Sequence, residues 1–190
     1  MDWVSTIVGA LIGFICSIGI ILIQRALDKA GKLNIYTKIV YDHSTGSYTW
    51  GFQDKGDHIC LNVPLWIEVH NLSNSTRIMR DVNLVLAKDG KVIVPMTQSN
   101  RSTSKKTHEE YLYANRGSYS FSIAGNEIVR YECHFLLKDA LCKAQFDEIK
   151  LRYYDEKNRC HHFSLGSVRG DWVPREFSRV ADWKLLKEEK

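Results

Sequence analysis

Cysteine and histidine side chains lie next to each other at two places in the chain, and both residue types bind transition metals. One place is Cys160-His161-His162 and the other is Cys133-His134. Neighbouring residues of a strand point to opposite faces, so only Cys160 and His162 of the first group could share a site. A structural zinc ion needs four such ligands, and no complete set stands at metal-binding spacing. We therefore expect no metal site, and an enzyme or metal centre that joins Cys133, Cys160 and His162 is our third hypothesis.

Short catalytic motifs give no support to an enzyme. His108-Glu109-Glu110 is similar to the beginning of a zinc-protease helix, but the second histidine of that motif is missing. The sequence contains no GxSxG, no phosphate-binding loop and no dinucleotide fingerprint. We expect a protein that is not an enzyme and that carries no cofactor.

The polar stretch from Thr97 to Glu110 is the best candidate for a binding region. It has no apolar residue and no periodicity, and loops of this length in compact domains are usually functional or disordered. Arginine and tyrosine are enriched at recognition surfaces, and loops on a rigid sheet often carry binding. We predict contact with a partner or an anionic ligand; a solvated excursion without function is the simpler interpretation. The candidate binding residues are Arg101, Lys105, Lys106, Tyr111, Tyr113 and Arg116.

Strands must hold this loop in place, and the clearest strand covers Ile59–Val69. Every odd-numbered residue of this segment is a large aliphatic residue, whereas the even-numbered residues are Cys60, Asn62, Pro64, Trp66 and Glu68. This alternation predicts a strand that buries its odd-numbered face. Pro64 has no backbone N–H, so we expect a bulge at this residue or an edge position for the strand.

The remaining pattern predicts an all-β domain over residues 33–170. Asp89-Gly90 between two apolar segments is a strong hairpin signal. About eight short strands separated by turn residues are typical of an antiparallel β-sandwich or a small β-barrel. We predict an immunoglobulin-like sandwich, with a small barrel as the alternative. Residues 171–190 are predicted to form a C-terminal amphipathic helix, because apolar residues recur on one helical face at Phe177, Val180, Ala181 and Leu185.

An uncharged apolar run from Trp3 to Ile23 precedes the domain. A helix needs about 20 such residues to cross the hydrocarbon core of a bilayer. No basic residue comes before the run and no small-residue cleavage site follows it, so we predict a retained transmembrane helix and not a signal peptide. Residues 1–32 then form the anchor with a basic juxtamembrane segment. Arg25, Lys29 and Lys32 place the C-terminal domain of this single-pass protein in the cytoplasm.

Small residues recur every four positions within the apolar run. Such a stripe lets two helix backbones approach closely in lipid. We therefore predict that the helix can self-associate, although glycine is also simply common in membrane helices. The stripe consists of Ser5, Gly9, Gly13 and Ser17.

The charge balance and the cysteines limit the possible partners. The net charge is +4, with acidic residues interspersed among the basic ones, so we predict no nucleic-acid partner. Free thiols are the expectation for a cytoplasmic domain. The domain cysteines are Cys60, Cys133, Cys142 and Cys160.

Two functional hypotheses stand ahead of the enzyme hypothesis. The first is an interaction module, a membrane-anchored β-domain that binds an unknown protein or small molecule at the membrane. The second is a ligand-sensing β-barrel effector that oligomerises through its transmembrane helix. An enclosed pocket with a few convergent polar groups would favour the effector, and a filled core would favour the module.

Overall fold

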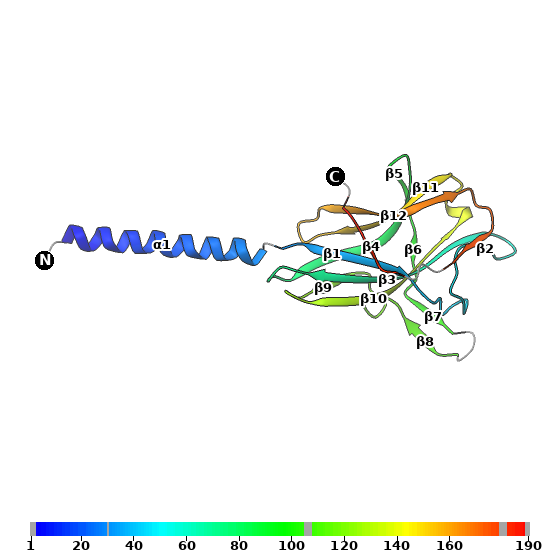
Figure 1. The fold of residues 1–190 in the computed structure, drawn as a ribbon, viewed down its shortest axis with the longest axis horizontal. Helices are drawn as coiled ribbons and strands as arrows, with labels where there is room; N and C mark the ends of the chain where they lie inside the picture. Colours follow the sequence, from blue (N-terminus) through cyan, green and yellow to red (C-terminus); the bar gives the residue numbers. More distant parts are fainter. Residues whose placement is uncertain (1–2, 30, 105–107, 179–181, 189–190) are drawn as a thin grey trace.

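The computed structural model describes residues 3–29, 31–104, 108–178 and 182–188. A single long helix, α1 (Trp3–Lys29), is followed by a domain of strands, and the helix projects away from that domain (Figure 1). Within α1, the 22 residues Ile7–Asp28 form a segment that is long and apolar enough to cross a membrane, and it buries nothing against the domain. A signal sequence near the N-terminus would have the same properties.

The first of two main sheets has seven strands. Its path runs β13, β2, β3, β1, β14, while β10 pairs with β3 and also with β6. All described pairings in it are antiparallel. The strands are β1 (Leu33–Ile39), β2 (Trp50–Asp54), β3 (Ile59–Asn71), β6 (Thr97–Gln98), β10 (Ile128–Lys138), β13 (Arg175–Phe177) and β14 (Lys184–Leu185).

The second sheet has five strands and packs against the first. Its order is β12, β11, β4, β5, and β9 pairs with β4. The strands are β4 (Arg77–Lys88), β5 (Lys91–Pro95), β9 (Phe121–Ile123), β11 (Phe146–Tyr154) and β12 (Cys160–Gly170). The described chain also forms a short helix, η1 (Asp139–Leu141), and a separate hairpin of β7 (Arg101–Thr103) and β8 (Glu110–Leu112).

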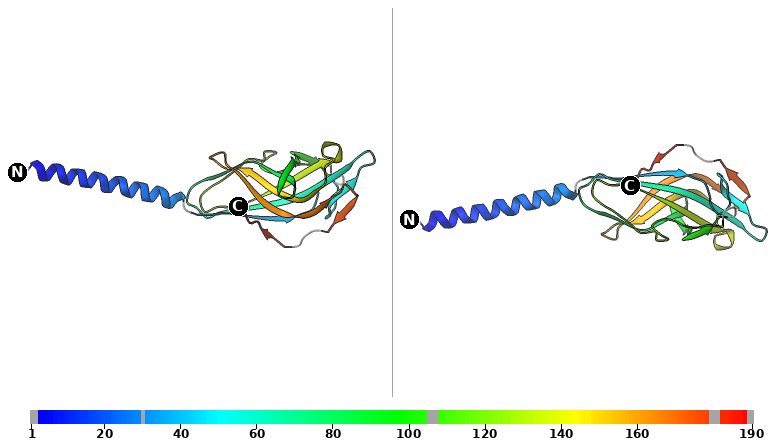
Figure 2. Two further views of the ribbon diagram at one scale, coloured as in Figure 1. Left: turned by 90° about the horizontal axis from the view of Figure 1, so that it is seen from above. Right: turned by 90° about the horizontal axis from the view of Figure 1, so that it is seen from below.

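Figure 2 shows these sheets as layers beyond the end of α1. The predicted all-β antiparallel sandwich is therefore confirmed, and the barrel alternative is wrong because the strand order of each main sheet is open. The Asp89-Gly90 turn joins β4 to β5 as predicted, and both residues have the positive φ angles that a tight hairpin turn needs. The Thr97–Glu110 stretch is more regular than a loop, because it contributes to β6, β7 and β8.

The odd-numbered residues of β3 form the centre of the core. Leu61, Val63, Leu65, Ile67 and Val69 have no exposed surface. The even-numbered face is divided: Cys60, Asn62 and Pro64 are buried, whereas the residues from Trp66 to His70 on that face are half-buried. Cys60, Asn62 and Pro64 are buried because chain segments cross the outer face of the sheet near Asn62. The sequence pattern therefore predicts which side chains face outward, but not which of them other segments cover.

Pro64 lies in a central strand, and the expected edge position is wrong. β3 pairs with β10 along one side, and its other side pairs with β2 up to Asn62 and with β1 from Leu65. The Pro64 carbonyl accepts a hydrogen bond from the Val40 N–H at 3.2 Å, which places the ring nitrogen on this second side. The missing N–H therefore falls at the end of the β1 ladder, next to the gap between β2 and β1, where it removes only the bond that would return to Val40.

The predicted C-terminal helix over 171–190 is wrong for the described residues. β13 adds to the edge of β2, and β14 adds to the edge of β1. The two edge strands have unpaired backbone N–H and C=O groups. The tail forms hydrogen bonds with these groups, which is more favourable than an isolated amphipathic helix. Phe177 packs on Trp50 with 4.7 Å between ring centroids, and Leu186 is buried. Val180 and Ala181 lie outside the described residues.

Candidate functional site

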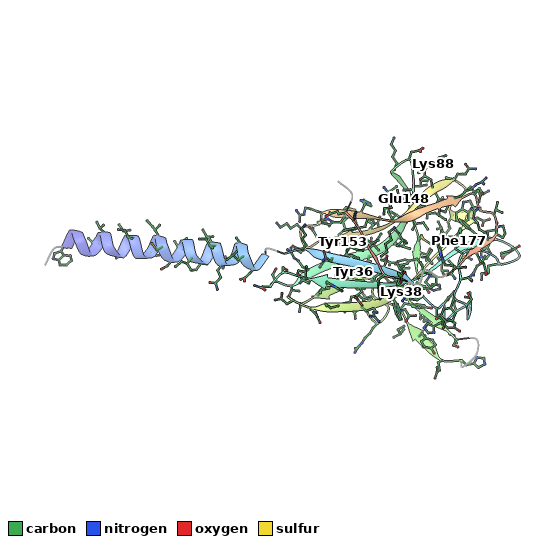
Figure 3. The ribbon with its side chains drawn as sticks, viewed as in Figure 1. Tyr36, Lys38, Lys88, Glu148, Tyr153 and Phe177 are labelled. Carbon is green, nitrogen blue, oxygen red and sulfur yellow. The ribbon has the colours of Figure 1, made fainter. Side chains whose placement is uncertain are left out.

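The outer face of the seven-stranded sheet carries a continuous group of aromatic and charged side chains. Residues paired across antiparallel strands share a face, and the register of β1, β3 and β10 aligns two such rows. One row is Lys38, Trp66 and Glu132, and the next is Tyr36, Glu68 and Arg130. Figure 3 labels Tyr36 and Lys38, which lie along β1. We call this surface the aromatic–cationic face and define it as Tyr36, Lys38, Trp66, Glu68, His70, Arg130 and Trp183.

Arg130 lies at the centre of the aromatic–cationic face. Its guanidinium is 4.8 Å from the ring centroid of Trp66 and 5.1 Å from that of Trp183. The two indole rings are stacked, with 6.1 Å between centroids. Lys38 lies 5.9 Å above the ring of Trp183 from the other strand. These contacts join β3, β10, β1 and the C-terminal tail into one surface, and each such cation–π pair contributes about 0.5–1 kcal/mol when exposed.

Glu68 fixes the orientation of Arg130. Its Oε2 accepts hydrogen bonds from Arg130 Nε at 3.0 Å and from Nη2 at 2.8 Å. The other carboxylate oxygen lies 2.9 Å from His70 Nε2, and the His70 ring packs on Tyr36 at 4.6 Å. The hydrogen bonds from His70 and Arg130 lower the pKa of Glu68. The face is thus a connected, preorganised network whose central cation remains 48% exposed.

Beyond this face, the same sheet surface is covered and holds a buried polar cluster of Asp42, Asn62 and His134. Asn62 Nδ2 donates to Asp42 Oδ2 at 2.6 Å, and its Oδ1 lies 2.5 Å from His134 Nε2. Asp42 also accepts from the Ser44 N–H and hydroxyl and from the Thr45 hydroxyl. All three cluster side chains are essentially buried. The cluster holds the 42–47 turn on the sheet.

The protonation states of this cluster follow from its hydrogen bonds. Since Asn62 Oδ1 can only accept, the proton of neutral His134 lies on Nε2. His134 Nδ1 is buried without a partner, so a second proton there would be an unsatisfied donor. Burial accordingly lowers the pKa of His134, and Asp42 opposes this only in part. Burial acts to raise the pKa of Asp42, but His134 and the hydrogen bonds from Ser44, Thr45 and Asn62 outweigh it and the net pKa is lowered.

Acid is therefore expected to destabilise the domain. A histidine whose folded pKa is lowered binds more protons when unfolded, so stability is lost as the pH falls below the unfolded value of about 6.5. Each unit of that shift corresponds to about 1.4 kcal/mol. Urea unfolding between pH 7.5 and 5 should show a smaller pH dependence in His134→Gln, which cannot titrate. His161→Gln is the matched control: the pKa of His161 is raised by Glu188 and Asp155 against its burial, so its loss should steepen the slope. An unchanged slope in His134→Gln would contradict this assignment.

The predicted binding residues lie on and beneath the β7–β8 hairpin. Tyr113 is buried: its ring packs on His134 at 4.9 Å, its hydroxyl lies 2.9 Å from Ser102, and burial raises its pKa to about 12. Tyr113 is therefore a structural anchor. Arg101 is exposed and pairs with Glu110 at 3.1 Å.

Two further residues of the predicted set remain at the surface. Tyr111 stacks on His43 at 4.2 Å, and His43 in turn contacts Glu132 at 2.9 Å. Arg116 is exposed in a turn with positive φ. Lys105 and Lys106 lie outside the described residues. Tyr111 is thus linked, through His43 and Glu132, to the row that holds Trp66 and Lys38, and no described contact joins Arg101 or Arg116 to that row.

The cysteine and histidine pairs do not converge. Cys160 and His162 share a face, as alternation predicts, with Cys160 Sγ 3.8 Å from His162 Nε2. Cys133 is buried in the core on β10 of the other sheet, and burial raises the pKa of its thiol well above the usual value. Within the part of the chain that the structure describes, no three His, Cys, Asp or Glu side chains are placed to hold a metal ion.

Two clefts flank the tail where it crosses from β1 to β12. One has a volume of about 260 Å³ and mostly apolar walls, and the other, nearer α1, has about 490 Å³ and mixed charged walls. Exposed residues of the tail line both, so each opens at the surface. The smaller cleft is lined by Ile39, Trp50, Leu65, Ile149 and Leu165. The larger cleft is lined by Arg77, Tyr153, Asp155, His161 and Phe163.

Trp66, Arg130 and Trp183 were missed as functional candidates in the sequence. Trp66 and Arg130 lie in ordinary strand patterns, and Trp183 lies in a tail that has helical periodicity. The available signal was a large aromatic residue on the polar face of an otherwise regular strand, since Trp66 interrupts the row of Asn62, Glu68 and His70.

Comparison with known proteins agrees with the observed architecture. Curated proteins give no match to this chain. Residues 31–165, which are more than half of the chain, match the model of a family described as the YopI Ig-like domain. This range begins just after α1 and runs into β12, so it covers most of both sheets. The chain therefore belongs to the YopI Ig-like domain family.

Proposed function

We propose that this protein is a membrane-anchored interaction module that binds a protein partner through the aromatic–cationic face. The observation that carries the proposal is the Arg130 guanidinium, half exposed and held over the rings of Trp66 and Trp183. Trp, Tyr and Arg dominate the binding energy of protein interfaces. A side chain that is already ordered loses less entropy on binding, and the contacts of Glu68 order this one.

A photo-crosslinking experiment tests this face. We expect p-benzoylphenylalanine in place of Tyr36 to form a discrete protein adduct in cells of the natural host. Tyr154, a half-buried tyrosine on β11 of the other sheet, is the matched control and should form no such adduct. In Arg130→Ala the Tyr36 adduct should fall about 30-fold, the effect of losing a hot spot worth about 2 kcal/mol. Equal adducts at both tyrosines, or an adduct indifferent to Arg130→Ala in a folded protein, would contradict the proposal.

We further propose that α1 is retained as a single span and that the domain faces the cytoplasm. The support is the basic cluster of Arg25, Lys29 and Lys32 after the apolar run, since such residues favour the cytoplasmic side. Cys160 is the suitable reporter, because it is exposed, the domain cysteines Cys60, Cys133 and Cys142 are buried, and Cys16 lies within the apolar run.

Thiol labelling gives the expected outcome of this orientation. An impermeant maleimide should label Cys160 only after the cells are opened, and the signal should disappear in Cys160→Ser. Labelling of Cys160 in intact cells would place the domain outside and reverse the orientation. Mass spectrometry of the chain purified from membranes should also detect residues Trp3 to Ile23, which would be missing if they formed a cleaved signal sequence.

A further inference from the structure

Gly31 and Lys32, which precede β1, are fixed to the domain by contacts that we call the Gly31 clamp. The Leu72 N–H, in the turn between β3 and β4, donates to the Lys32 carbonyl at 3.1 Å. Arg77 Nη2 lies 3.5 Å from the Gly31 carbonyl oxygen. Gly31 has φ +132°, and a Cβ at this position would lie 2.5 Å from the Leu72 carbonyl oxygen. Only glycine allows this approach, so the chain that leaves α1 is packed onto the β3–β4 turn.

This clamp places one end of the domain at a defined height above α1. The 22 residues Ile7–Asp28 are about 33 Å long as a helix, which matches the roughly 30 Å of a bilayer's hydrocarbon core. Only residues 30–32 separate α1 from β1, and three residues extend at most about 11 Å. The β3–β4 turn is hydrogen-bonded at the level of Lys32, so it would lie no more than about 13 Å beyond the hydrocarbon core, in or directly above the headgroup layer.

Large aliphatic side chains are exposed at this end. Leu72 is 55% exposed and Ile128, the first residue of β10, is 64% exposed. They are neighbours, because the Asn71 N–H donates to the Glu127 carbonyl at 2.9 Å. Exposure alone does not distinguish this end, since Leu141 beyond the far end of β10 is 64% exposed. The Gly31 clamp distinguishes the two ends, because it lies at the end of the domain that holds Leu72 and Ile128. β10 is 11 residues or about 36 Å long, and Leu141 lies beyond its other end.

We infer that the Leu72–Ile128 end of the domain is a lipid-contact surface, seated in the bilayer interface by the Gly31 clamp. The inference rests on the proposed membrane span of α1. The transfer of apolar side chains from water into the boundary between headgroups and acyl chains lowers the free energy. The long axis of the domain runs roughly along that of α1 (Figure 1). The outer side of β1, β3 and β10, which carries the aromatic–cationic face, would then point sideways, toward other proteins in the same membrane.

Photo-crosslinking to lipid tests the inference with matched leucines. The full chain, with p-benzoylphenylalanine in place of Leu72 or of Leu141, is reconstituted into vesicles of tritiated phosphatidylcholine and illuminated. We expect a tritiated protein adduct from position 72 and background from position 141. No adduct at position 72, or equal adducts at both, would overturn the inference.

Two changes at the clamp test its role. A flexible Gly-Ser insertion after Gly31 leaves the domain sequence intact and should abolish the adduct at position 72. Gly31→Val should do the same, whereas Gly56→Val should not, because Gly56 also has positive φ but no atom near its added Cβ. An undiminished adduct after the insertion would show that the clamp does not seat the domain.

Alkaline carbonate extraction separates the two proposals. Chain that leaves the vesicles in carbonate would contradict the membrane span, and the lipid-contact surface would fall with it. Chain that remains in the vesicles but gives no adduct at position 72 would overturn the lipid-contact surface alone.

Discussion

Leu61→Ala is expected to lower the free energy of unfolding by about 2–5 kcal/mol, the usual result of removing a large side chain from a core. Leu61 has no exposed surface and lies on β3, the strand that pairs with β1, β2 and β10. Its cross-strand neighbours Phe52 and Leu137 are also buried, so they cannot collapse into the cavity without moving two strands. Urea unfolding of the full chain in detergent, followed by tryptophan fluorescence, measures the loss.

Leu141→Ala is the matched control for that prediction. It makes the same chemical change at a leucine that is 64% exposed in η1, so the free energy of unfolding should change by less than about 0.5 kcal/mol. Similar losses in Leu61→Ala and Leu141→Ala would mean that β3 is not the centre of the core.

Self-association through α1 is expected to disappear when Gly9 and Gly13 are both replaced with isoleucine. In the structure a Cβ at either glycine meets no atom within 4 Å, so this helix face is open. Packing is the main force that joins helices in lipid, and two isoleucines would hold the backbones apart. Membrane insertion should persist because both changes add apolar surface. The Ser17 hydroxyl already donates to the Gly13 carbonyl of the same helix at 2.8 Å. Ser17 therefore contributes to the stripe through its small size and not through a hydrogen bond between helices.

Single-molecule photobleaching of the labelled full chain in supported bilayers measures this effect. Leu11→Ile with Ile15→Leu changes the same helix at the same spacing but keeps its volume, and it should leave the oligomer unchanged. A parent protein that is already monomeric would remove self-association, and with it the effector that oligomerises through α1. An oligomer that survives in Gly9→Ile with Gly13→Ile would place the contact on another face of the helix.

Local patterns in the sequence determined the helix, most strands and the buried face of β3. The run from Trp3 to Ile23 contains no charged residue and no proline that would interrupt a helix. The strict alternation from Ile59 to Val69 assigns each side chain to a face. The Asp89-Gly90 turn was equally readable, because few residues tolerate its backbone angles. In these cases the decisive interactions lie within a few residues of each other, so the sequence alone carries the information.

Tertiary structure decided the position of Pro64 and the form of the tail. Whether Pro64 loses a hydrogen bond depends on where β2 ends and β1 begins along its side of β3, which no local pattern encodes. The tail has helical periodicity, yet it forms β13 and β14 because two strand edges from distant parts of the chain are available to pair with it. Backbone pairing across the sheet outweighs a weak local preference.

The candidate site likewise exists only in the folded domain. Arg130 and Glu68 are separated by 62 residues, and Trp183 reaches Trp66 only because β14 pairs with β1. Tyr113 belonged to the predicted binding residues, but packing against His134 buries it. The sequence thus determined which residues could form strands and an anchor. The register between distant strands decided which side chains meet at the surface, since antiparallel pairing brings together residues that are far apart in the chain.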